Sequence, residues 1–211
     1  MTSKDASATR TKLLEAARDV IRSQGYAATT VDDICAAAGV SKGSFFHHFA
    51  SKEEMGIAAI DYWNVTTAAL FESQPYAALP DPRDRVFGYV DFRAALIRGG
   101  IPQFTCLIGT TVQETYATHP GLRAISDTGL TNHVAMLARD LDAAKQRYAP
   151  DAAWTGESVG TFMQAVLQGG FIFAKASQDP ETAKACIAHL RSYLETLLGK
   201  PDASETQGTR Q

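Results

Sequence analysis

The chain is predicted to be all-α, with an N-terminal three-helix unit that contains a helix-turn-helix and a larger C-terminal helical region. Apolar residues recur at helical spacing in the segments between turn signals, and no sustained alternation of apolar and polar residues is present. Residues 29–55, TTVDDICAAAGVSKGSFFHHFASKEEM, have the pattern of two short helices joined by a tight turn and followed by the start of a third.

The predicted elements divide the chain into three parts. We expect a helix-turn-helix domain at 1–52, a larger helical domain at 53–199, and a polar, disordered tail at 200–211. The predicted helices lie at about 8–24, 30–38, 42–49, 52–72, 83–98, 105–118, 122–147, 154–177 and 180–198. A bend rich in proline and alanine, QPYAALPDPRD, separates the fourth helix from the fifth.

The helix-turn-helix pattern rests on local signals for helix ends. Thr30 is placed to cap a helix, and Asp33 follows three residues later in the capping-box position. Gly39 ends that helix, because glycine readily takes the left-handed conformation. Ser41 can cap the next helix, in which Phe45 is spaced to face the core.

The second short helix offers a polar and aromatic face of the kind that enters the major groove of DNA. Ser44 and His47 lie one turn apart and are expected to reach base edges. The full set expected at DNA is Thr30, Ser41, Lys42, Gly43, Ser44, Phe46, His47, His48 and Lys52, of which Lys42, Phe46, His48 and Lys52 are assigned to phosphate or sugar. The alternative is an ordinary solvated helix. Adjacent histidines point about 100° apart on a helix, so a metal site there is not expected.

Residues 9–60 resemble the TetR family of bacterial transcriptional regulators. The resemblance lies in TRTKLLEAARDVIRSQGYAATTV and in the aromatic-rich SKGSFFHHFASKEEM. It implies a homodimeric repressor that leaves a palindromic DNA operator when an effector binds. One departure is Phe46, where many members carry a tyrosine whose hydroxyl meets a phosphate. The phenyl ring can still pack on a sugar.

Composition narrows the class of protein. The chain has 211 residues and a formal net charge of −3, and its first 55 residues carry equal numbers of basic and acidic side chains. Any attraction for DNA is therefore local rather than spread over a basic surface. No apolar run is long enough to cross a membrane, and the N-terminus does not have the pattern of a signal peptide. Three cysteines without metal-type spacing indicate reduced thiols in a cytoplasm, with neither a metal nor a cofactor expected.

The last two predicted helices, 154–177 and 180–198, are too broadly apolar for surface helices that bury a single stripe. Two such helices can pair with their copies across a two-fold axis to form a four-helix interface. The alternative is that they complete the core of the monomer. The family resemblance favours the homodimer.

Cys106 and Lys175 form a candidate sensor. Cys106 follows a Gly-Gly-x-Pro loop at a predicted helix start, where the helix N-terminus favours the thiolate, and Lys175 interrupts the apolar run GGFIFAKAS. These regions resemble the electrophile-responsive, NemR-like branch of the family, in which a cysteine and a lysine come together. The alternative is a buried cysteine and a lysine at an exposed edge. Cys35 is expected in the core, and Cys186 at or near the dimer interface.

The larger helical region is expected to enclose an effector pocket. Side chains suited to line it are Trp63, Phe92, Gln113, Tyr116, His133 and Phe171. The helix that begins at Lys52 is expected to connect this pocket with the DNA-binding unit. A thiol-based redox sensor that uses Cys106 is a second hypothesis. An enzyme on a helical bundle is a third, which the sequence disfavours because it lacks a paired Glu-x-x-His motif, a glycine-rich phosphate loop and a Ser-His-Asp arrangement.

Overall fold

The computed structural model describes residues 3–201, and within that range the chain is all-α, as predicted. The elements are α1 (Ser3–Gln24), α2 (Val31–Ala38), α3 (Lys42–His48), α4 (Lys52–Glu72), the 3₁₀-helix η1 (Pro75–Ala78), α5 (Pro82–Ala95), α6 (Ile101–Phe104), α7 (Leu107–Thr115), α8 (Pro120–Tyr148), α9 (Gly156–Ser177) and α10 (Pro180–Leu198). The disordered tail predicted at 200–211 falls almost wholly outside the described residues.

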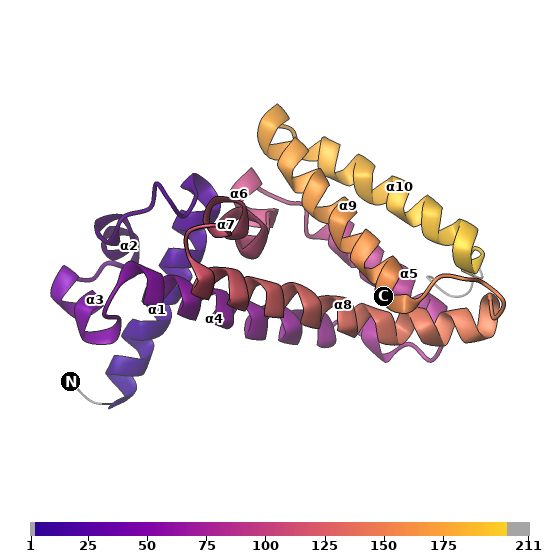
Figure 1. Ribbon diagram of the computed structural model, residues 1–211, viewed down its shortest axis with the longest axis horizontal. Helices are drawn as coiled ribbons and strands as arrows, with labels where there is room; N and C mark the ends of the chain where they lie inside the picture. Colours follow the sequence, from indigo (N-terminus) through magenta and orange to yellow (C-terminus); the bar gives the residue numbers. More distant parts are fainter. Residues whose placement is uncertain (1–2, 202–211) are drawn as a thin grey trace, which may run out of the picture.

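The helices form an elongated molecule (Figure 1). Helices α1–α3 lie at one end, and α4 and α8 run side by side along the long axis. Helices α9 and α10 pack against each other beside the far half of α8, with α5 beneath them. The long helices α4 and α8 therefore connect the helix-turn-helix end to the remainder of the molecule.

One predicted helix, 105–118, is divided differently in the structure. Pro102 lies in the first turn of the short helix α6, which ends at Phe104. Thr105 and Cys106 are then extended, with ψ angles of 158° and 130°, so α7 begins only at Leu107. The break leaves Cys106 as the N-cap of α7.

The apolar side chains form two clusters. One joins α1–α4 and includes Leu107, Ile108 and Leu122 from α7 and α8. The larger one is built mainly from α5, α8, α9 and α10. The boundary predicted at residue 52 coincides with the start of α4. The N-terminal apolar cluster continues past it, because Met55 and Ile60 of α4 belong to that cluster. No helix among residues 3–201 has the length and hydropathy needed to cross a lipid bilayer.

Candidate nucleic-acid interface and effector cavity

The local signals of the helix-turn-helix are present as predicted. Thr30 Oγ1 accepts a hydrogen bond from Asp33 N at 3.1 Å, and Asp33 Oδ2 accepts one from Thr30 N at 2.8 Å. Asp33 Oδ2 also accepts from Thr30 Oγ1 at 2.8 Å, and the bonds donated to this carboxylate, that from Thr30 N first, hold the pKa of Asp33 below its usual value. Gly39 is left-handed with φ 66°, and Ser41 Oγ accepts from Ser44 N at 3.2 Å. A reciprocal capping box therefore fixes the start of α2, and a serine N-cap fixes the start of α3 after the glycine turn.

Helix α3 has one buried and one exposed face. Phe45 and Phe49 are buried in the same cluster as Leu14 and Ile21 of α1, as expected. The exposed face carries Ser41, Lys42, Gly43, Phe46 and His47, with Ser44 half-buried. A rigidly seated short helix that presents these side chains to solvent is suited to contact a DNA groove.

Lys42 and His48 on α3 differ in how accessible they are to DNA. Lys42 forms an ion pair with Asp32 at 2.9 Å, and both side chains are largely exposed. Such surface pairs are weak, so a phosphate can compete for the ammonium group. His48 is less accessible than expected, because its Nε2 is buried without a hydrogen-bond partner. Burial, and then the nearby His47 and Arg10, lower the pKa of His48.

Lys52 does not have the position expected of a phosphate contact. Its Nζ donates hydrogen bonds to the carbonyl oxygens of Tyr26 at 2.8 Å and Thr29 at 2.7 Å, and lies 4.4 Å from the centre of the Tyr26 ring. Burial lowers the pKa of the Lys52 ammonium group. Lys52 therefore holds the loop between α1 and α2, and its ammonium group is already occupied by these carbonyl oxygens.

A cavity of about 750 Å³ lies among α1, α4, α8 and α9. Four predicted sensor residues line it, namely Trp63, Cys106, His133 and Phe171. The other four do not. The Phe92 ring packs on Phe71 with ring centres 5.6 Å apart, Gln113 and Tyr116 are exposed at the C-terminal end of α7, and Lys175 lies outside the lining.

Four arginines that the sequence pattern did not indicate also line this cavity, namely Arg18, Arg22, Arg93 and Arg139. Arg22 is only 8% exposed, and its Nε donates to the carbonyl oxygen of Thr105 at 2.7 Å. Its guanidinium lies 5.0 Å from the centre of the Trp63 ring, and burial lowers its pKa. In the sequence, Arg22 is set apart only by its spacing, which matches that of the apolar residues of its helix. This spacing does not show whether the side chain lines a cavity or lies at a solvated edge of the helix.

His133 takes part in a polar chain in the wall of the cavity. Tyr89 Oη and His133 Nε2 are 2.9 Å apart, and Gln164 Nε2 donates to Tyr89 Oη at 3.0 Å. Burial, and to a lesser extent the charge of Arg93, lower the pKa of His133 to about 3. Burial also raises the pKa of Tyr89. Both side chains are therefore neutral at physiological pH.

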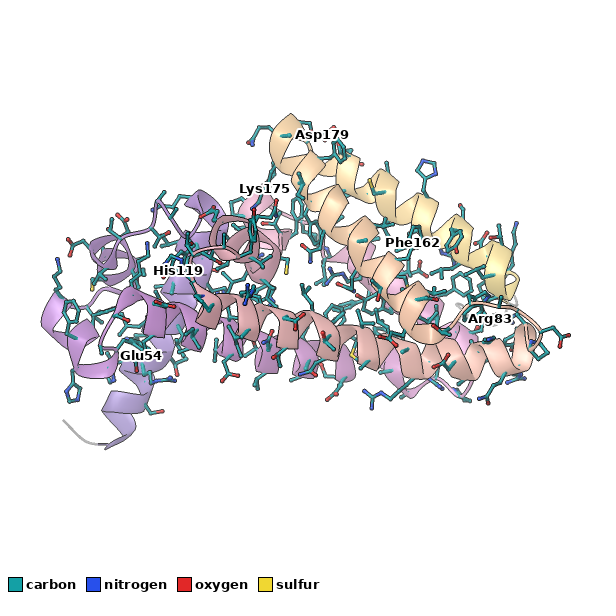
Figure 2. The ribbon with its side chains drawn as sticks, in the orientation of Figure 1. Glu54, Arg83, His119, Phe162, Lys175 and Asp179 are labelled. Carbon is teal, nitrogen blue, oxygen red and sulfur yellow. The ribbon has the colours of Figure 1, made fainter. Side chains whose placement is uncertain are left out.

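Cys106 and Lys175 lie at the same end of α7. Cys106 Sγ accepts from Gly109 N at 3.5 Å, and Lys175 Nζ donates to Thr110 Oγ1 at 2.7 Å. Thr110 Oγ1 in turn donates to the carbonyl oxygen of Cys106 at 3.0 Å. Figure 2 shows Lys175 on the part of α9 that approaches α7. Burial lowers the pKa of Lys175, and the nearby Cys106 and Glu114 side chains oppose that shift.

The other two cysteines occupy structural positions. Cys35 is buried, and burial raises the pKa of its thiol. Cys186 on α10 is half-buried and faces Gly170 of α9. All three thiols are free, and residues 3–201 contain no cluster of histidine, cysteine, aspartate and glutamate side chains suited to hold a metal ion.

Comparison with known proteins identifies the N-terminal domain. Residues 13–59 match the model of bacterial regulatory proteins of the tetR family. The N-terminal domain is of the TetR family. Among its relatives, the transcriptional regulator AcuR of Cereibacter sphaeroides is 32% identical over 122 residues, which is 57% of this chain and 55% of that protein. The transcriptional repressor NemR of Escherichia coli is 23% identical over 192 residues, which is 89% of this chain and 94% of that protein.

Solved structures show that the likeness of fold extends over nearly the whole chain. The reduced form of E. coli NemR superposes with a TM-score of 0.74 at 22% identity, covering 92% of this chain and 100% of that one. A TetR regulator from Chloroflexus aurantiacus superposes with a TM-score of 0.80 at 22% identity, covering 92% and 98%. The C-terminal region therefore also has the fold seen in these solved structures.

Proposed function

We propose that the chain is a cytoplasmic, homodimeric repressor that binds a palindromic DNA operator through α3 and leaves it when a small molecule occupies the cavity. The observation that carries the proposal is the doubly capped helix pair α2–α3, whose outer face presents Lys42, Ser44 and His47 beyond a closed core. Ser44 and His47 contact base edges, while Lys42 and Phe46 contact the backbone. Thr30, Ser41 and Gly43 border this contact, and His48 is peripheral to it.

The outer faces of α9 and α10 support the dimer. Phe162, Ile172, Phe173 and Tyr193 are large apolar or aromatic side chains that are 40–64% exposed. The rings of Phe162 and Tyr193 lie 4.9 Å apart, so they form one continuous patch, and Figure 2 shows Phe162 on the α9–α10 pair. A Cβ added at Gly169 would meet nothing within 4 Å, so a partner helix can approach closely there. Contiguous exposed apolar surface of this kind is typical of a protein–protein interface.

The elements that line the cavity also build the DNA-binding unit, which supports coupling between the two. Arg22 of α1 and Trp63 of α4 face the cavity, and both helices contribute to the N-terminal core. Helix α7 adds a second connection, because Glu114 Oε2 accepts from Ala27 N at 2.7 Å in the loop before α2. A ligand that fits only one arrangement of these helices shifts the population of DNA-binding dimers by its differential affinity.

A thiol switch is the second candidate, and the position of Cys106 favours it. Cys106 lines the cavity, Arg22 donates to the carbonyl oxygen of the preceding Thr105, and Lys175 is linked through Thr110 to the carbonyl oxygen of Cys106. Addition of an electrophile to the Cys106 thiol would add bulk beside these contacts. An enzyme is not retained, since the similar proteins are named transcriptional regulators.

Selection of bound fragments from genomic DNA tests the proposal. We expect enrichment of one short palindrome, with two half-sites about one helical turn apart. Recovery of DNA without a shared site would reject α3 as the helix that recognises base sequence. If one site is enriched, the genes beside it would indicate the effector.

A further inference from the structure

The charges that line the cavity are not balanced. Four arginines line it but only two carboxylates, Asp61 and Glu72, and both carboxylates are exposed to solvent. Arg18 is paired with Asp19, through Nε–Oδ1 and Nη2–Oδ2 distances of 2.7 and 2.8 Å. Arg93 and Arg139 have no ion pair or hydrogen bond with any of residues 3–201. The cavity therefore contains guanidinium donors that the described residues leave without a hydrogen-bond acceptor.

Arg93 is the better placed of these two unpaired arginines, because aromatic rings surround it. Its guanidinium carbon lies 5.3 Å from the ring centre of Phe71, 5.6 Å from that of Phe171 and 5.9 Å from that of Tyr89. Contacts with ring faces stabilise the cation without using its N–H groups, which lie in the guanidinium plane. The rings thus hold Arg93 in place and leave its guanidinium N–H groups free to donate two parallel hydrogen bonds to a planar anion.

His133 supplies a neighbouring donor. Because Gln164 donates to Tyr89 Oη, the Tyr89 hydroxyl is free to donate to His133 Nε2. A neutral His133 then carries its proton on Nδ1, and no hydrogen bond occupies Nδ1 within the described chain. Arg93 lies close enough for its charge to act on His133. One guanidinium and one imidazole N–H together suit a single carboxylate.

We propose that the effector is a small organic carboxylate whose anionic group binds Arg93 and whose apolar body packs on Trp63, Phe71 and Phe171. This inference rests on the proposed function, since it assigns a chemical class to the ligand of the same cavity. The cavity of about 750 Å³ is within the usual range for sites that bind small molecules. An organic cation would face unpaired arginines, and a multiply charged anion would meet aromatic walls around Arg93.

The test compares carboxylates with their neutral amides. Calorimetric titration of the intact protein with 3-phenylpropionate and octanoate is set beside titration with 3-phenylpropanamide and octanamide. We expect at least one acid to bind, and its amide to bind about tenfold or more weakly, because the amide lacks the charge that pairs with arginine. Arg93→Gln should abolish the preference for the acid. Arg191→Gln is the matched control, because Arg191 pairs with Asp91 on the surface.

Ligand binding tests the carboxylate site, and operator binding tests the proposed function independently. Equal binding of acid and amide, unchanged affinity in Arg93→Gln, or no binding of either acid at millimolar concentration would overturn the inference. If Arg93→Gln does not fold, as judged by circular dichroism, Arg93→Lys replaces it and should bind the acid more weakly than the wild type. Operator binding is measured separately. Its failure would reject the proposed function, while acid-selective binding would still establish the site.

Discussion

Arg22 Nε donates a hydrogen bond of 2.7 Å to the carbonyl oxygen of Thr105, which joins the last turn of α1 to the residue before Cys106. Arg22 is almost fully buried, and the two residues are 83 positions apart in the chain. One side of this contact belongs to the DNA-binding unit, and the other adjoins the cavity. A rearrangement around Cys106 would therefore alter a contact of α1.

Replacing Arg22 by methionine should weaken this connection. The variant keeps much of the packing on Trp63 but leaves the Thr105 carbonyl without its donor, which should lower the free energy of unfolding by about 1–3 kcal/mol. We also expect effector-induced release of DNA to be reduced more than DNA affinity itself. Urea unfolding and operator titration with and without ligand measure the two effects. If the effector still releases Arg22→Met fully from DNA and the free energy of unfolding is unchanged, the Arg22–Thr105 contact does not couple the cavity to α1.

Lys42 and Lys52 should behave differently, although both were assigned to phosphate from the sequence. Lys42→Ala should weaken DNA binding at every sequence and lower the salt dependence of log K by about one unit, as expected for one lost phosphate contact. Lys52→Met should instead lower the free energy of unfolding by about 1–3 kcal/mol, because carbonyl oxygens of the α1–α2 loop lose their donor. Its salt dependence, after correction for the folded fraction, should match that of the wild type. A reduced salt slope in Lys52→Met would restore the original assignment.

His133 should make stability depend on pH. Its pKa is about 3 in the folded chain against an ordinary 6.5, so the unfolded chain binds an additional proton between these values. The contribution of neutral His133 is thus fully present above pH 6.5 and is lost progressively as the pH falls toward 3. The slope that one group adds in this range is at most about 1.4 kcal/mol per pH unit. His133→Gln should flatten the dependence, and equal slopes in the two proteins would contradict a neutral His133.

Phe173→Glu should produce monomers. Phe173 is 64% exposed on α9, and a charge placed there would be buried without a partner if α9 and α10 form the interface. Sedimentation equilibrium measures the change, and operator affinity should fall because one monomer contacts only one half-site. Leu79→Glu is the control, since Leu79 is 39% exposed but lies outside α9 and α10. A dimer that survives Phe173→Glu but not Leu79→Glu would place the interface elsewhere.

The features that the sequence predicted most accurately are those determined by residues close together in the chain. The capping pair Thr30 and Asp33, the left-handed Gly39 and the buried Phe45 lie within one short segment, so their spacing alone determines their roles. Lys52 could not be assigned in this way, because its partners lie 23 to 26 residues earlier in the chain. The same holds for Arg93. Only the packing of α4, α5, α8 and α9 places aromatic rings and a cavity around it.

Fluorescence anisotropy with the selected operator tests the central claim that α3 reads DNA. The account predicts that wild-type affinity falls steeply with rising salt, and that the Lys42→Ala, His47→Ala double variant binds at least tenfold more weakly. The same variant should remain a folded dimer, because both side chains lie outside the core. Unchanged operator affinity in that folded double variant would contradict the assignment of α3 as the recognition helix.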